Sequence, residues 1–165
     1  MPSKIKRAAY VRNFIFGVED SLVSTVGLVS GVAAAGVDRS TIFITGLVLI
    51  VVEALSMGVG SALSETSAEE FIFHKIKTDS HPTIGGLIMF ISYFVAGFIP
   101  LIPYILFDVT QAFPLSILAS LVALFLLGYV SARFYKARVL KNGVRMLVLG
   151  GLAIFAGVLV GSLLR

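Results

Sequence analysis

The chain has 165 residues, of which 58% are hydrophobic and 13% charged, and its formal net charge is +4. Soluble domains are nearer half apolar and a quarter charged, so a globular core of this size could not hide so much apolar surface and lipid must cover the rest. The composition indicates an integral membrane protein, with too few residues for a large soluble domain as well. The sequence has no cysteine, which excludes disulfides and thiolate metal sites.

Five apolar segments are each near the roughly 20 residues that a helix needs to cross the hydrocarbon layer. Strands of a lipid-facing barrel would be about ten residues long and alternate in polarity, and these segments do neither. The predicted spans are residues 14–36, 42–63, 84–107, 113–132 and 144–164, with the third interrupted by Pro100 and Pro103. We expect an all-α integral membrane protein with five transmembrane helices, forming a single domain over residues 1–165, with a short cytosolic helical extension at about 65–83.

Basic residues set the expected orientation. They precede the first span or lie between the second and third or the fourth and fifth, and only Arg39 and Arg165 fall on the other side. The positive-inside rule then places the N-terminus in the cytosol and the C-terminus on the far side. A full-length span with no small-residue cleavage site follows the basic N-terminal segment, so we expect no removable signal peptide. We expect the cell (inner) membrane to hold the protein, rather than an organelle membrane.

Small residues recur at four-residue spacing within the predicted spans. In lipid, such rows let helix backbones approach closely, because the hydrophobic effect no longer drives helix packing. We expect most of them to pack helices within the chain, and one or two to serve a subunit interface. The rows are Gly27 and Gly31; Ala54, Gly58 and Ala62; Ser116 and Ser120; and Gly157 and Gly161.

Three acidic residues, Glu19, Asp20 and Glu53, lie within the first two predicted spans. An ionised carboxylate in hydrocarbon costs about 3 kcal/mol even on lenient scales, so such a residue marks a functional site by default. At about 1.5 Å per residue, Asp20 lies about 9 Å from the cytosolic boundary, Met57 about 10 Å and Glu53 about 16 Å. Because Glu53 and Met57 are four residues apart, they share a helix face. Two carboxylates and a thioether can therefore surround one point.

Hard carboxylate oxygens with one soft sulfur suit a divalent transition ion better than calcium or magnesium. We assign Asp20, Glu53 and Met57 as candidate metal ligands. Glu19 points about 100° away from Asp20 around the helix, so we expect it to face a neighbouring helix or lipid headgroups and treat it as a weaker candidate. The alternatives are packing for Met57, an interfacial position for Asp20, and a protonated, hydrogen-bonded acid at Glu53.

The predicted extension of the second span carries a polar strip. Its residues fall on adjoining parts of one helical surface, where like charges four residues apart repel one another. Either neighbouring lysine side chains or a captured metal ion could offset this charge, and the strip leads toward Glu53. The further candidate metal ligands are Glu65, Glu69, Glu70 and His74.

Two segments carry a family resemblance. Residues 15–31 read IFGVEDSLVSTVGLVSG and residues 53–64 read EALSMGVGSALS. They resemble the first two spans of the vacuolar iron transporter family, with its D-G-hydrophobic-V-S-T and A-L-S-M-x-x-G-E-Y-hydrophobic-S patterns. The resemblance implies a five-helix homodimer that moves ferrous iron, and often manganese, out of the cytosol in exchange for protons. It also implies that Asp20 and Met57 line the pathway.

The chain departs from the family pattern at three points. Ser21 stands where the family has Gly. Ser61 stands at the carboxylate that follows the Met in the family, while Glu53 places an acid on the same helix face, one turn to the other side of Met57. The family's long, Glu-rich cytosolic metal-binding insert is replaced by residues 65–83 only, so the chain resembles a short form.

We therefore expect a transporter that exports Fe²⁺, and also Mn²⁺, by proton antiport, with no permanently bound cofactor and no enzymatic activity. The expected partners are the lipid bilayer, a second copy in a homodimer, divalent metal ions and protons, but no nucleic acid, because the basic residues are not grouped as a nucleic-acid footprint. The alternative is a non-transporting membrane scaffold or subunit whose buried acids make interhelical hydrogen bonds. An enzyme is the third possibility, with only two histidines and no nucleotide-binding or Ser-His-Asp pattern to support it.

Overall fold

The computed structural model describes residues 3–73, 81–134 and 138–164, which form five α-helices and contain no strand. The helices are α1 (Ser3–Ala34), α2 (Arg39–Phe73), α3 (Pro82–Leu106), α4 (Val109–Phe134) and α5 (Val139–Leu163). All five are long and apolar enough to cross a membrane. This result confirms the predicted fold class and the five predicted spans. The predicted extension of the second span is helical as far as Phe73, and His74 lies outside the described residues.

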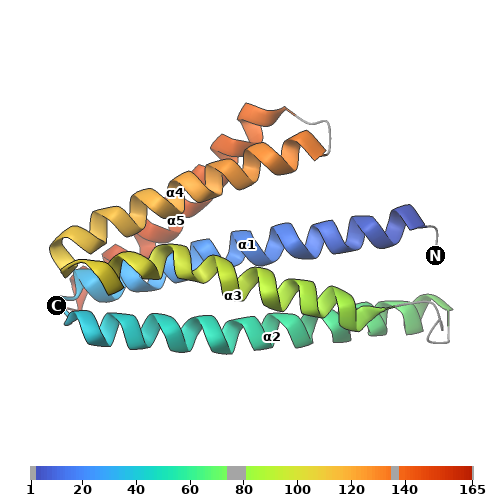
Figure 1. The fold of residues 1–165 in the computed structure, drawn as a ribbon, viewed down its shortest axis with the longest axis horizontal. Coiled ribbons are helices and arrows are strands. Elements are labelled where there is room, and N and C mark those ends of the chain that lie inside the picture. Colours follow the sequence, from blue (N-terminus) through green and yellow to red (C-terminus); the bar gives the residue numbers. More distant parts are fainter. Residues whose placement is uncertain (1–2, 74–80, 135–137, 165) are drawn as a thin grey trace.

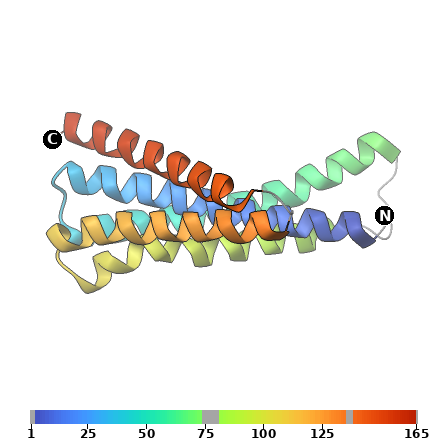
Figure 2. The same cartoon turned by 90° about the horizontal axis from the view of Figure 1, so that it is seen from above.

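The helices lie roughly along one axis with α1 at the centre, as Figures 1 and 2 show from two directions. α1 packs against each of the other four helices, α2 packs mainly on α3, and α5 packs on α1 and α4. The α4–α5 pair diverges from α1 toward the end of the molecule where α1 begins (Figure 1). α5 ends at the opposite end, as an odd number of spans requires.

Two helix crossings depend on glycine. A Cβ atom at Gly31 of α1 would lie 2.7 Å from the carbonyl oxygen of Gly157 in α5, and one at Gly161 would overlap the backbone of Gly31. Between α2 and α3, a Cβ atom at Gly58 would lie 3.0 Å from the carbonyl oxygen of Gly86. These rows of small residues pack helices within the chain, as predicted, because only a glycine lets the two backbones come so close.

The predicted interruption of the third span at Pro100 and Pro103 is wrong, because α3 runs through both residues. The hydroxyl of Ser116 in α4 donates a hydrogen bond to the carbonyl of Pro100 at 2.6 Å. The N–H of Phe107 donates to the carbonyl of Pro103 at 2.9 Å. These bonds pair the carbonyls of both prolines, and membrane helices tolerate a proline because surrounding groups can satisfy the backbone that it disturbs.

The turn between α1 and α2 closes one helix and begins the next. Gly36 has a φ of 80° and donates its N–H to the Ala33 carbonyl at 3.0 Å, which caps α1. Asp38 caps α2, accepting a hydrogen bond from the Thr41 N–H at 3.1 Å and further ones from the Ser40 and Thr41 hydroxyls. The hydrogen bonds from Ser40 and Thr41 hold the pKa of Asp38 well below its ordinary value.

Candidate functional site

Two carboxylates from different helices lie close together within the membrane-spanning part of the bundle. Asp20 of α1 and Glu53 of α2 are both half-buried. They are near enough to interact electrostatically with each other, and both belong to helices that are apolar enough to span a membrane. The structure therefore brings together the two acids that the sequence assigns to one site. Their role as metal ligands stays a prediction.

Tyr93 of α3 is a third polar group at this place, and the sequence analysis did not identify it. Its side chain is fully buried, and its hydroxyl lies 2.6 Å from the Ser24 hydroxyl of α1. Ser21 donates a hydrogen bond to the Tyr93 carbonyl at 2.6 Å. The Tyr93 side chain is also within electrostatic range of both Asp20 and Glu53. A tyrosine inside an apolar span needs a partner for its hydroxyl, and this requirement is the signal that could have identified it.

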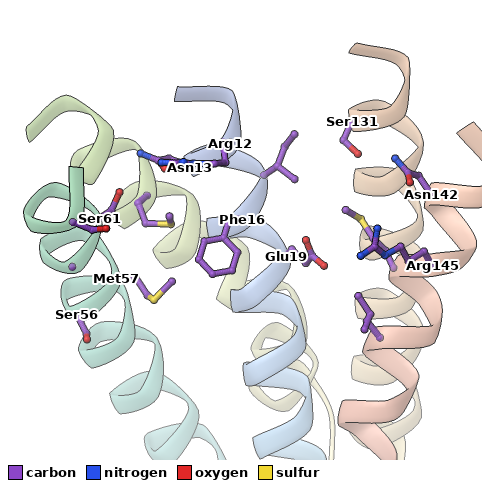
Figure 3. A pocket seen from close by; sticks show the side chains of 16 residues that line it. Arg12, Asn13, Phe16, Glu19, Ser56, Met57, Ser61, Ser131, Asn142 and Arg145 are labelled. Atoms are coloured by element: carbon purple, nitrogen blue, oxygen red, sulfur yellow. The ribbon is translucent and has the colours of Figure 1, made fainter. Parts of the chain in front are cut away.

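A cavity of about 870 Å³ lies along α1 between α2 and the α4–α5 pair, and we refer to it as the groove (Figure 3). Met57 reaches into it from α2 toward Phe16 of α1 (Figure 3). Asp20 and Glu53 are not among the lining residues, so the groove does not include the acid pair. The lining residues are Arg12, Asn13, Ile15, Phe16, Glu19, Ser56, Met57, Gly60, Ser61, Ser64, Met89, Ser131, Asn142, Arg145, Met146 and Leu149.

Glu19 lines the opposite side of the groove from Met57. It points from α1 toward Arg145 of α5 (Figure 3), and the two charges attract each other. Asp20, its neighbour in sequence, interacts instead with Glu53 of α2. Successive residues of a helix point about 100° apart, so these two acids meet different helices. Glu19 faces α5 and Asp20 faces α2.

The polar strip on α2 divides between the interior and the surface. Glu69 is buried, Glu65 is half-buried and Glu70 is exposed. Glu65 is repelled by Glu69 and attracted by Arg12 of α1. Three residues that the sequence places on one helical surface therefore differ in their access to solvent, because α1 and α3 cover only part of that surface.

No single cluster of acids and histidines forms a complete metal site in the part of the chain that the structure describes. Within residues 3–73, 81–134 and 138–164, no three His, Cys, Asp or Glu side chains are grouped so that they could hold one ion. Asp20 and Glu53 place two carboxylates on two different helices, and a transition ion held between them would need further donors. The nearby sulfur of Met57, a tyrosine oxygen, water or a second copy of the chain could supply them.

Comparisons with known proteins extend over almost the whole chain. A family model described as the VIT family matches residues 11–81 and 73–162. Vacuolar iron transporter homolog 4 of Arabidopsis thaliana is 28% identical over 159 residues, which cover 90% of this chain and 80% of the relative. Vacuolar iron transporter 1 of Oryza sativa subsp. japonica is 23% identical over 203 residues, covering 87% of this chain and 81% of the relative. An uncharacterized protein of Methanocaldococcus jannaschii is 28% identical over 162 residues, covering 87% and 83%.

Proposed function

This chain belongs to the VIT family, and on that premise we propose that it transports a divalent transition-metal ion, Fe²⁺ and also Mn²⁺, out of the cytosol. The relatives named as vacuolar iron transporters support a metal ion as the substrate. The observation that carries the proposal is the proximity of Asp20 and Glu53 on two different helices. Two acids at this depth are too costly to serve only as packing, and a cation would balance both charges.

In the proposed path, the ion first meets the strip of Glu65, Glu69, Glu70 and His74. It then enters the groove beside the Met57 sulfur and passes to the carboxylates of Asp20 and Glu53. Support comes from the position of Met57, which lines the groove and lies four residues, or about one helical turn, from Glu53. Tyr93, held by Ser24, would orient the acid pair from the third helix.

Proton antiport follows from the chemistry of the acids. A carboxylate must be ionised to bind a metal ion, so binding displaces protons. In general, burial favours the neutral form of a carboxyl group and a bound cation favours the ionised form. The same pair can therefore carry metal in one direction and protons in the other.

We also propose that the working unit is a homodimer that forms across the groove. Ser56 and Gly60 of α2 are exposed, and a Cβ atom at Gly60 would meet nothing within 4 Å. A second copy could pack on these small residues and bring its own donors to the acid pair. Because the chain has no cysteine, a Ser56→Cys variant should form a disulfide between copies, whereas Val95→Cys, on an exposed face of α3, should not. Equal cross-linking of both variants would contradict this interface.

The transport proposal is tested by Fe²⁺ flux into proteoliposomes under a proton gradient. We expect Asp20→Asn and Glu53→Gln each to lower the flux about tenfold or more, because each removes one anionic ligand. Asp108→Asn is the matched control, since Asp108 is exposed in the turn between α3 and α4. Undiminished Fe²⁺ flux in both site variants would refute the mechanism. Loss of folding or dimerisation in Glu53→Gln, in a protein whose wild type moves no metal, would favour the scaffold alternative.

The membrane that holds the protein is a separate question. The sequence-based expectation is the cell membrane, whereas the plant relatives are named after the vacuole. Membrane fractionation of the tagged chain in its native cells would distinguish the two. In either membrane, the proposed direction of metal movement is out of the cytosol.

A further inference from the structure

The cytosolic extension of α2 meets α1 and α3 at a buried polar cluster that differs from the acid pair at Asp20 and Glu53. Asn13 of α1 is 2% exposed, and its Nδ2 atom has no hydrogen-bond partner among the residues that the structure describes. Buried amide groups are almost always paired with protein atoms or ordered water. An unpaired buried amide therefore has room in its hydrogen bonding for a water molecule or a ligand.

Glu65 of α2 approaches the same glycine of α3 as Asn13 does, and Glu69 lies about one helical turn further along α2. Glu69 is only 5% exposed, and within residues 3–73, 81–134 and 138–164 the Oε2 atoms of Glu69 and Glu65 both lack a hydrogen-bond partner. The two carboxylates repel each other, while the charge of Arg12 attracts Glu65. One guanidinium cannot balance two carboxylates, and buried charges are normally paired or bound to a metal ion.

The side chains of Asn13 and Glu65 converge where α3 carries a glycine. A Cβ atom at Gly85 would lie 2.8 Å from the Nδ2 atom of Asn13 and 2.8 Å from the Oε2 atom of Glu65. Any larger residue would therefore collide with both side chains, so the glycine is what lets Asn13 and Glu65 approach each other at this point.

We propose that Asn13, Glu65 and Glu69 bind one divalent metal ion at this junction of α1, α2 and α3. The ion's identity rests on the proposed function, since it would be the transported ion on its way into the groove, which Asn13 also lines. A rotation of the Asn13 amide by 180° exchanges Nδ2 for Oδ1 and presents a third oxygen donor. Two carboxylates and an amide oxygen form a hard donor set that suits Mn²⁺ and Fe²⁺.

A bound ion would also hold the extension of α2 against the bundle. Without a cation, the two like charges on α2 and the unpaired amide oppose close packing at this place. When a cation is bound, all three side chains gain a common partner. Binding should therefore raise the thermal stability of the protein.

The first test measures Mn²⁺ binding to the detergent-purified full-length chain by the electron paramagnetic resonance signal of free Mn²⁺. An Asp20→Asn/Glu53→Gln background removes the intramembrane acids, so the remaining site is measured alone. We expect Glu65→Gln and Glu69→Gln each to weaken binding about tenfold or more, and Asp108→Asn to leave it unchanged. Glu70→Gln should weaken it less than Glu69→Gln. Equal losses from these two variants would indicate a diffuse acidic strip and would overturn the proposal, as would undiminished binding in Glu69→Gln.

The second test adds a carboxylate with Asn13→Asp. If Asn13 is a metal ligand, this variant should unfold at a lower temperature than wild type in a chelator and show a larger rise on addition of Mn²⁺. If Asn13→Asp lowers the unfolding temperature equally with and without Mn²⁺, Asn13 serves packing, and its role as a ligand is overturned. The two proposals fail separately. Mn²⁺ binding that depends on Glu65 and Glu69 in a protein that moves no metal would leave this site standing and refute the transport function.

Discussion

At the scale of single residues, Tyr93 connects the acid pair to the packing of the bundle. Its hydroxyl is hydrogen-bonded to the Ser24 hydroxyl and lies within electrostatic range of Asp20 and Glu53. Ser21 bonds to the carbonyl of the same residue. The tyrosine is therefore held by α1 at both its backbone and its side chain.

We predict that Tyr93→Phe lowers Fe²⁺ flux several-fold while the protein still folds. The loss of the hydrogen bond to Ser24 should cost about 1 kcal/mol of stability. Thermal unfolding in detergent and proteoliposome flux, measured on the same preparation, separate the two effects. Tyr129→Phe, which changes an exposed tyrosine of α4, is the control. A Tyr93→Phe protein with unchanged flux would remove Tyr93 from the site.

A second prediction at the residue scale concerns Asp38, which caps α2. Its folded-state pKa lies below the ordinary value of 3.8, chiefly through the hydrogen bond from Ser40 and also through those from Thr41. The ionised cap therefore stabilises the folded state fully above the unfolded pKa, and this stabilisation is lost as the pH falls toward the folded value. Wild type should unfold at a higher temperature than Asp38→Asn near neutral pH. The difference should shrink below about pH 4, and a difference that grows on acidification would contradict the cap.

At the scale of helices, the crossing of α1 and α5 requires glycine. We predict that Gly31→Ala lowers the stability of the protein by about 1–3 kcal/mol, the usual cost of overpacking, because the new Cβ would lie 2.7 Å from the Gly157 carbonyl oxygen. Gly151→Ala is a matched control on α5, where a Cβ atom would meet nothing within 4 Å. The unfolding temperatures of the two variants are compared in the same detergent. Equal losses of stability would show that the close approach of α1 and α5 is not the cause of the effect at Gly31.

At the scale of the whole molecule, the orientation in the membrane can be tested with single cysteines, because the chain has none of its own. Lys141 at the start of α5 and Gln111 at the start of α4 are both exposed. The positive-inside rule predicts that a cysteine at 141 reacts with an impermeant maleimide only from the cytosol, and one at 111 only from the far side. Labelling of both from the same side would contradict the five-span orientation.

The sequence by itself determined the number and type of the spans. Lipid cannot satisfy backbone polar groups, so each long apolar segment must form a helix, and segment length then decides whether it crosses the membrane. The cost of placing a charged group in lipid also identified the acids at positions 20 and 53 as candidate site residues. Four-residue spacing identified glycines that pack α1 on α5. The predicted interruption of α3 at its two prolines was wrong, because packing against neighbouring helices, which the sequence does not show, decides whether a membrane helix continues through a proline.

Only the tertiary structure decided which neighbour each side chain meets. In a soluble protein the apolar face of a helix identifies the side that is buried, but in a membrane both the interior and the lipid are apolar, so the pattern does not distinguish them. The sequence therefore could not show that Glu19 faces Arg145 or that Tyr93 joins the acid pair. Nor could it show that Glu69 is buried while Glu70 is exposed. Helical periodicity determines the angle between two side chains, whereas the packing of α1, α2 and α3 determines what lies at each angle.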